Sequence, residues 1–185
     1  MAQRELIELA RAGDREAFSA LAASVVDRLY ATAVLILRDR SVADDATQET
    51  IVRAWRDLPS LRDPDRFDAW LHRLLVNACR DEGRRQRRWR PEVTLLPIHD
   101  AVVDDSSGGL ADTDALERGF RRLGPDQRAV IVLRHYHGLS LPEVADAMGV
   151  PLGTAKSRLH HATRALRAAL EADARGGGMT RGGTA

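Results

Sequence analysis

Residues 139–170 read LSLPEVADAMGVPLGTAKSRLHHATRALRAAL, a pattern that predicts two helices joined by a tight turn. Ser140 and Glu143 have the spacing of a capping box, which begins a helix by pairing side chains with free backbone N–H groups. Gly149 is expected to end this helix, because glycine adopts the left-handed backbone of a helix C-cap without strain. A second helix is predicted to begin near residues 151–154.

The second predicted helix has one apolar face and one basic face. Its apolar stripe recurs at helical spacing and consists of Ala155, Leu159, Ala162, Leu166 and Leu170. The other face carries Lys156, Ser157, His160, Arg164 and Arg167, and residues 153–170 contain no acid. Such a helix suits the phosphates and base edges of a DNA major groove. The pattern therefore favours a helix–turn–helix that binds duplex DNA over a solvated hairpin or a membrane-surface helix.

Composition indicates a protein with ordinary apolar cores. Hydrophobic residues make up 44% of the 185 residues, which allows one domain or two small ones. The charged, amphipathic amino terminus is unlike a signal peptide, and no apolar run approaches the length of a membrane span. The single cysteine, Cys79, permits no internal disulfide, and no Cys/His cluster indicates zinc. We therefore expect a cytoplasmic protein without a metal or another cofactor.

The formal net charge of +1 conceals blocks of opposite sign. Residues 80–90 hold six arginines and two acids, whereas residues 91–117 hold seven acids and no Lys or Arg. Residues 153–170 return to four cations without an acid. Two positive zones on either side of an acidic connector predict contact with an extended polyanion at two places.

Helical periodicity dominates the chain, and it predicts an all-α fold of two small domains. The first domain is expected at residues 1–90, with long helices through residues 18–36, 42–58 and 67–78. The middle helix is predicted to face inward with Ile51, Ala54, Trp55 and Leu58.

The second domain is expected at residues 113–174, with helices near 114–123 and 125–135 before the helix–turn–helix. Residues 91–112 are predicted to form a flexible acidic linker, long enough to span about 75 Å when extended. Residues 175–185 have too little apolar material to pack and are predicted to be a disordered tail.

Two groups of polar side chains in the first domain are candidate binding surfaces. Asp44, Asp45, Gln48 and Glu49 are helical neighbours, although such a charge run is by itself more typical of a solvated face. The loop at residues 62–66 is followed by Phe67, Trp70, Arg73, Asn77 and Arg80, and these lead into Arg84 and Arg85. Aromatic, amide and cationic groups together suit unstacked bases and a single-stranded backbone. Trp70 is more easily explained as a core residue, so Arg73 and Asn77 are the better candidates for base contact.

Three motifs, in this order, resemble the extracytoplasmic-function sigma factors, which are promoter-recognition subunits of bacterial RNA polymerase. They are DDATQETIVRAW at residues 44–55, FDAWLHRLLVNACRDEGRR at 67–85 and LSLPEVADAMGVPLGTAKSRLHHATRAL at 139–166. The resemblance covers both predicted domains and leaves out the tail and much of the linker. One departure is Ala46–Thr47, where the family more often carries apolar residues.

The resemblance implies a role for each surface. Asp44, Asp45, Gln48 and Glu49 would face the clamp helices of the largest subunit of core RNA polymerase. The loop that ends at Arg66, with Phe67, Trp70, Arg73 and Asn77, would read a flipped base of the −10 element, while Arg80, Arg84 and Arg85 would hold its backbone. The −35 duplex would meet Arg134, Thr154, Lys156, Ser157, Arg158, His160, His161 and Arg164.

The resemblance also implies partners and regulation. The acidic linker would thread the basic RNA path of the polymerase, whose two largest subunits would both contact the protein. Such factors are generally held inactive by an anti-sigma protein, often at the inner face of the membrane.

Two other functions remain to be weighed. A metal hydrolase built on His135, His137, His160 and His161 lacks an acidic or cysteine partner at ligand spacing. A stand-alone helix–turn–helix regulator would bind duplex DNA without polymerase, but it leaves the acidic helix, the linker and the second basic zone unexplained. The sequence shows no Ser/His/Asp set, glycine-rich phosphate loop or paired carboxylates, so we do not expect an enzyme.

Overall fold

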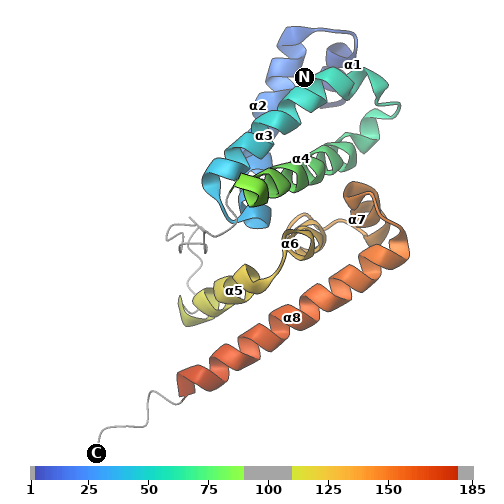
Figure 1. The fold of residues 1–185 in the computed structure, drawn as a ribbon. Helices are drawn as coiled ribbons and strands as arrows, with labels where there is room; N and C mark the ends of the chain where they lie inside the picture. Colours follow the sequence, from blue (N-terminus) through green and yellow to red (C-terminus); the bar gives the residue numbers. More distant parts are fainter. Residues whose placement is uncertain (1–2, 90–109, 179–185) are drawn as a thin grey trace, which may run out of the picture.

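The computed structural model describes residues 3–89 and 110–178, and every regular element in these ranges is a helix (Figure 1). The first half comprises α1 (Gln3–Arg11), α2 (Arg15–Leu37), α3 (Arg40–Asp57), the 3₁₀ turns η1 (Leu58–Ser60) and η2 (Pro64–Arg66), and α4 (Phe67–Trp89). The second half comprises α5 (Leu110–Arg122), α6 (Pro125–Ile131), the π-helical η3 (Val132–Tyr136), α7 (Leu141–Met148) and α8 (Leu152–Gly178). The prediction of an all-α fold is confirmed.

Short-range hydrogen bonds set the corner between α2 and α3. Helix α2 ends at Leu37, and its C-cap residue Arg38 has a left-handed backbone (φ 61°) that turns the chain, while its N–H still donates to the Val34 carbonyl at 2.8 Å. One residue later, Asp39 begins α3 because its carboxylate accepts the backbone N–H groups of Ser41 and Val42. The two helices consequently run back along each other, and α4 packs on α3 to complete the first half (Figure 1).

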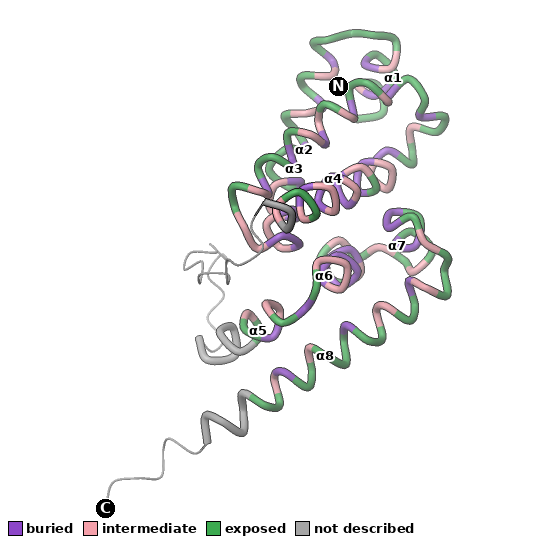
Figure 2. Tube along the Cα trace, in the orientation of Figure 1, coloured by how far each residue is buried: buried purple, intermediate pink, exposed green. Residues whose placement is uncertain are grey.

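The inward face of α2 follows the predicted helical period. Its buried stripe consists of Leu21, Val25, Leu29, Ala33 and Ile36 (Figure 2). By length and composition α2 would also suffice to cross a membrane, with a mean hydropathy of 1.7, contrary to the expectation that no such run exists. The burial of its stripe in the core of the first half accounts for this apolar character.

The prediction that Trp55 faces inward is wrong, because its side chain is 38% exposed. Small residues fill the inner side of α3, where Ala43, Ala46 and Ala54 are buried and leave little depth for an indole. The Trp55 ring instead lies at the edge of the helix pair, with its centroid 4.9 Å from that of Phe18 in an edge-on contact.

The Ala46–Thr47 departure is accommodated within the core. Both residues are buried, and the Thr47 hydroxyl donates to the Ala43 carbonyl at 2.7 Å. A buried hydroxyl that is satisfied by its own helix removes most of the penalty of placing a polar group there.

The two halves are docked against each other through α4 with α6 and α7, and through α2 with α6. Their buried apolar residues belong to one continuous cluster. Ion pairs cross the junction from Arg66 to Asp146 at 2.7 Å and from Arg80 to Asp126 at 2.9 Å. We call this docked state the closed arrangement.

Two predicted boundaries differ from the structure. Helix α5 begins at Leu110, inside the stretch predicted to be linker, and α8 continues to Gly178, past the predicted start of the tail at residue 175. Extending an existing helix costs far less than nucleating one, which explains both overruns. The rest of the predicted linker and tail lies outside the described residues.

Candidate nucleic-acid interface

The predicted helix–turn–helix is present and is held by the expected caps. The Ser140 backbone N–H and hydroxyl both donate to Glu143 Oε2, at 2.7 and 2.6 Å. These hydrogen bonds hold the pKa of the Glu143 carboxyl below its ordinary value, and the bond from the Ser140 hydroxyl has the larger effect. Gly149 closes α7 in the left-handed region at φ 63°, and α8 begins at Leu152.

Small residues and one arginine set the geometry of the motif. Ala145 of α7 and Ala155 of α8 are both buried, in agreement with a close approach of these two helices. Arg134 Nη1 donates to the Leu139 carbonyl at 2.7 Å and so holds the loop before α7. In the closed arrangement this residue supports the motif; whether it also touches DNA stays a prediction.

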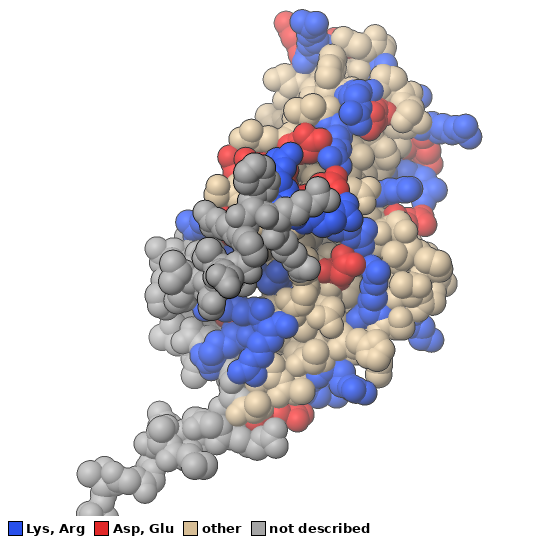
Figure 3. Space-filling view, viewed as in Figure 1, with Lys and Arg blue, Asp and Glu red and all other residues tan. Residues whose placement is uncertain are grey.

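The outer face of α8 is open to solvent along the predicted contact residues. Its exposed members are Lys156, Ser157, His160, His161 and Arg164. Thr154 is half-buried at the helix start, where its carbonyl accepts the Ser157 hydroxyl at 3.1 Å. Lys and Arg side chains are visible on both halves, several with acids beside them (Figure 3). The side chain of Arg158 differs from the others, because it turns toward the first half and pairs with Asp126 at 3.1 Å.

On α4, the aromatic residues and the polar candidates separate by burial. Phe67 is only 3% exposed and contributes to the core, with its ring centroid 5.9 Å from that of Trp70. A buried ring offers no face to a base in the closed arrangement, and contact of Phe67 with DNA stays a prediction. Trp70 is half-buried and packs against the core, while Arg73 is exposed and Asn77 is half-buried.

The arginines predicted to meet the −10 element divide into two groups. Arg66 and Arg80 bond to the second half: Arg66 pairs with Asp146, and Arg80, whose side chain is 22% exposed, pairs with Asp126. Arg84 and Arg85 are exposed and, among the described residues, pair with acids of their own helix, at 2.6 Å to Asp81 and 3.1 Å to Glu82. Sequence reasoning did not anticipate that the second half would engage two of these residues.

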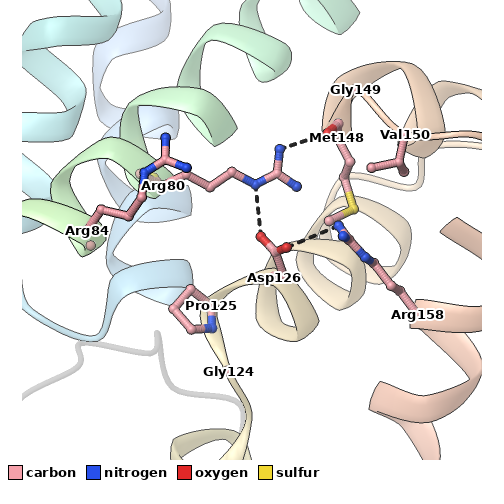
Figure 4. Close-up of a pocket in the computed structure, with 11 residues that line it drawn as sticks. Arg80, Arg84, Gly124, Pro125, Asp126, Met148, Gly149, Val150 and Arg158 are labelled. Carbon is pink, nitrogen blue, oxygen red and sulfur yellow. Dashed lines mark hydrogen bonds and ion pairs between the residues drawn. The ribbon is translucent and has the colours of Figure 1, made fainter. Parts of the chain in front are cut away.

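An open pocket of about 540 Å³ lies where α4, α6, α7 and α8 meet (Figure 4). Arg80 enters it from α4 and donates from Nη1 to the Met148 carbonyl at 2.7 Å. Asp126 lies between Arg80 and Arg158, so one carboxylate is shared by one arginine from each half. The pocket therefore joins two cations, Arg80 and Arg158, that the resemblance predicts to contact two different DNA elements.

Within the described ranges, no hydrogen bond or ion pair joins the acidic face of α3 to the second half. Asp44, Asp45 and Gln48 are exposed, and the Gln48 amide donates to Asp44 at 2.9 Å. Val52 is 60% exposed on the same helix and was not predicted as a contact residue. The sequence feature that could have identified Val52 is its position four residues after Gln48, which places both residues on the same helix face.

Within the described ranges, no group of three or more His, Cys, Asp and Glu side chains is placed to hold a metal ion. Cys79 is buried, and burial raises the pKa of its thiol to about 12. A thiol in this state is a poor nucleophile and a poor metal ligand at neutral pH.

Comparison with known proteins identifies the family of both halves. The chain matches the family Sigma-70 region 2 over residues 21–89 and the family Sigma-70, region 4 over residues 113–166. It is 38% identical to the RNA polymerase sigma-E factor of Streptomyces avermitilis over 78% of this chain and 80% of the relative. It is 35% identical to the ECF RNA polymerase sigma factor SigM of Mycobacterium tuberculosis, over 88% of this chain and 81% of the relative.

Solved structures of similar proteins share the fold. The sigma factor RpoE of Bartonella quintana, solved with the anti-sigma factor NepR, has a TM-score of 0.66 and 28% identity over 83% of this chain and 96% of that one. CnrH, solved with the cytosolic domain of CnrY, has a TM-score of 0.65 and 32% identity over 94% of this chain and 99% of that one. The chain therefore belongs to the extracytoplasmic-function sigma factors, which direct promoter-specific transcription by bacterial RNA polymerase.

Proposed function

We propose that this sigma factor uses three surfaces of its two halves to start transcription, without catalytic chemistry of its own. The α3 face binds core RNA polymerase, the surface of α4 and the preceding loop binds the opened −10 element, and the outer face of α8 binds the −35 duplex.

The observation that carries the proposal is the outer face of α8. It presents Lys156, His160 and Arg164 to solvent on a helix that is fixed by a capped α7 and a left-handed glycine turn. This is the geometry by which a second helix enters a major groove while the first helix supports it. Thr154 and Ser157 at the start of α8 supply short polar groups for base edges or phosphates.

Recognition of the −10 element is assigned to Arg73, Asn77 and the rim of Trp70, with Arg84 and Arg85 on the backbone. Arg73 is exposed, and Asn77 lies one helical turn beyond it. Flipping a base out of the duplex costs a few kcal/mol, which contacts of this kind must offset. Arg66 and Arg80 join this surface only after they leave Asp146 and Asp126.

The α3 face is assigned to core polymerase because it combines exposed polar groups with exposed apolar ones. Asp45 and Gln48 lie beside Val52, and Trp55 continues the apolar edge. Apolar side chains left open beside polar groups are typical of a surface that another protein covers. The face is accessible in the closed arrangement, so core binding does not first require the halves to separate.

An anti-sigma protein is the expected regulator. The two similar structures above are complexes with NepR and with the cytosolic domain of CnrY. By analogy, this factor acts in the cytoplasm and is held inactive there, at the membrane when its inhibitor is anchored in one.

Transcription with purified core polymerase over a promoter library tests the proposal. We expect the protein to co-elute with core and to direct initiation at defined start sites that share sequences near −10 and −35. A matched reaction with an Asp45→Ala, Gln48→Ala variant should lose both activities. Binding to duplex DNA without any effect of core would instead support a stand-alone regulator.

A further inference from the structure

Two histidine rings meet at the junction of the halves. His72 of α4 is 5% exposed, and its ring centroid lies 4.3 Å from that of His137, which caps the end of η3. The His137 Nε2 is 2.8 Å from the Thr32 hydroxyl of α2. The pair therefore joins a helix end of the second half to two helices of the first half.

The surroundings of the pair disfavour a positive charge. Burial lowers the pKa of both rings, that of His137 to about 4, and the nearby cation Arg28 of α2 lowers both further. Asp68 of α4 acts in the opposite direction, but it is already paired with Arg28 at 2.8 Å. From η3, the Tyr136 ring stands edge-on to His137 at 5.0 Å. Among the described residues, the charges that move these two pKa values come from α2 and α4.

We propose that His72 and His137 form a proton-sensitive closure between the two halves. Neutral rings pack together and hold the closed arrangement, whereas a proton on the buried His72 or the half-buried His137 places a charge away from bulk water, beside another ring and Arg28. Separation of the halves returns both rings to water, where the positive form is stable. The neutral histidine pair therefore favours the closed arrangement, and protonation at acid pH removes this preference.

The direction with pH follows from linkage. Both rings have lowered pKa values when the halves are closed, so protons favour the open state. Closure is fully present above the ordinary histidine pKa of 6.5 and is lost as the pH falls toward about 4. For His137 alone, the equilibrium constant for closing should be roughly tenfold smaller at pH 5.5 than at pH 7.5.

Opening would free Arg66 and Arg80 from Asp146 and Asp126, which exposes cations assigned to promoter DNA. This consequence rests on the proposed function. The closure itself does not rest on the proposed function, because it concerns only the distance between two parts of one chain.

Energy transfer between dyes on the full-length chain measures that distance directly. Ser19→Cys on α2 and Ala168→Cys on α8 place exposed thiols on the two halves, while buried Cys79 stays unreactive. We expect high transfer at pH 7.5 and a progressive loss between pH 6.5 and 5.0, with helicity by circular dichroism unchanged. Constant transfer over this range would overturn the proposal, and no polymerase is needed for the measurement.

Three variants separate the histidines from other groups. The His72→Gln, His137→Gln pair keeps polar side chains of similar length but removes both titrating rings, and its transfer should no longer depend on pH above 5.0. His135→Gln, at an exposed position of η3, should respond as the unaltered protein does. An unchanged response in the double variant would overturn the proposal. If the double variant loses helicity, the single variant His137→Gln tests the proposal instead. It should remove the tenfold fall in the closing equilibrium constant at pH 5.5.

Discussion

Arg80 Nε donates to Asp126 Oδ1 at 2.9 Å, so a cation assigned to promoter DNA is bound by a carboxylate of the other half. The same carboxylate lies 3.1 Å from Arg158 of α8. Because a carboxylate and a backbone phosphate both offer anionic oxygens to a guanidinium, Asp126 would compete with DNA for both arginines if they bind the promoter as proposed. Under that proposal, closure and promoter binding oppose each other at this position.

Replacing Asp126 should loosen the closed arrangement. Asp126→Asn removes the charge but keeps the shape, and a partly exposed ion pair contributes about 0.5–1 kcal/mol. We expect promoter affinity of the holoenzyme to rise by about two- to fivefold, since that energy no longer opposes release of Arg80. Asp65→Asn, which breaks a pair with Arg4 inside the first half, is the control. Equal affinities for the two variants would argue that Asp126 does not restrain Arg80.

Replacing Lys156 should weaken recognition of the −35 element. Lys156→Ala should cost about 1–3 kcal/mol of promoter binding if the ammonium group contacts a base edge. The measurement is holoenzyme affinity for the preferred −35 sequence and for single-base variants of it. An equal loss on all sequences would make Lys156 a phosphate contact. Arg15→Ala, which removes an exposed cation at the start of α2, should leave both affinities unchanged.

Replacing Asp45 and Gln48 together should impair binding to core polymerase. Both side chains are exposed and make no contact that the fold needs, so helicity should be retained. Titration of labelled core gives the affinity, with Glu16→Ala on α2 as a matched loss of one exposed acid. An affinity equal to that of the unaltered protein would remove α3 from the interface.

Replacing Arg84 and Arg85 should flatten the salt dependence of promoter binding. Each contact with a single-stranded phosphate contributes about 0.7 to the slope of log affinity against log salt, so loss of two contacts lowers this slope by about 1.4. Holoenzyme binding over a range of salt concentrations measures this slope. Arg11→Ala with Arg15→Ala removes the same charge from the far end of the first half and should leave it unaltered. A slope that persists in the Arg84, Arg85 variant would place the phosphate contacts elsewhere.

Replacing Ser140 should destabilise the second half by about 1 kcal/mol, because the cap of α7 is lost. Its hydrogen bonds also lower the pKa of Glu143, so their stabilising effect is present above the ordinary glutamate pKa of 4.5. As the pH falls below that value and through the lowered pKa of the folded protein, Glu143 takes up a proton and the effect is lost. The hydrogen bond that the Ser140 hydroxyl accepts from the backbone N–H of Glu143 does not depend on pH. Thermal unfolding of Ser140→Ala and the unaltered protein should thus differ more at pH 7 than near pH 3, whereas Ser19→Ala should show no difference at either pH.

Most of the helices and the helix–turn–helix were predictable, because their signals are local. The Ser140–Glu143 cap, the left-handed turn at Gly149 and the buried stripe of α2 each depend on residues a few positions apart. The outward turn of Trp55 and the burial of Phe67 were not predictable. Helical spacing places a residue on a face, but the neighbouring helix decides how much of a large ring that face can cover.

The amino-acid order alone determined where most of the helices begin and end, which faces are apolar and which helix carries the basic face that we propose binds DNA, since hydrogen bonds and spacing within about four residues suffice for these. Only the tertiary structure decided that the halves dock, that Arg80 meets Asp126 and that His137 meets Thr32 and His72. Arg80 and Asp126 are 46 positions apart, and Thr32 and His137 are 105 positions apart. Their approach depends on how whole helices pack, and no local pattern carries that information.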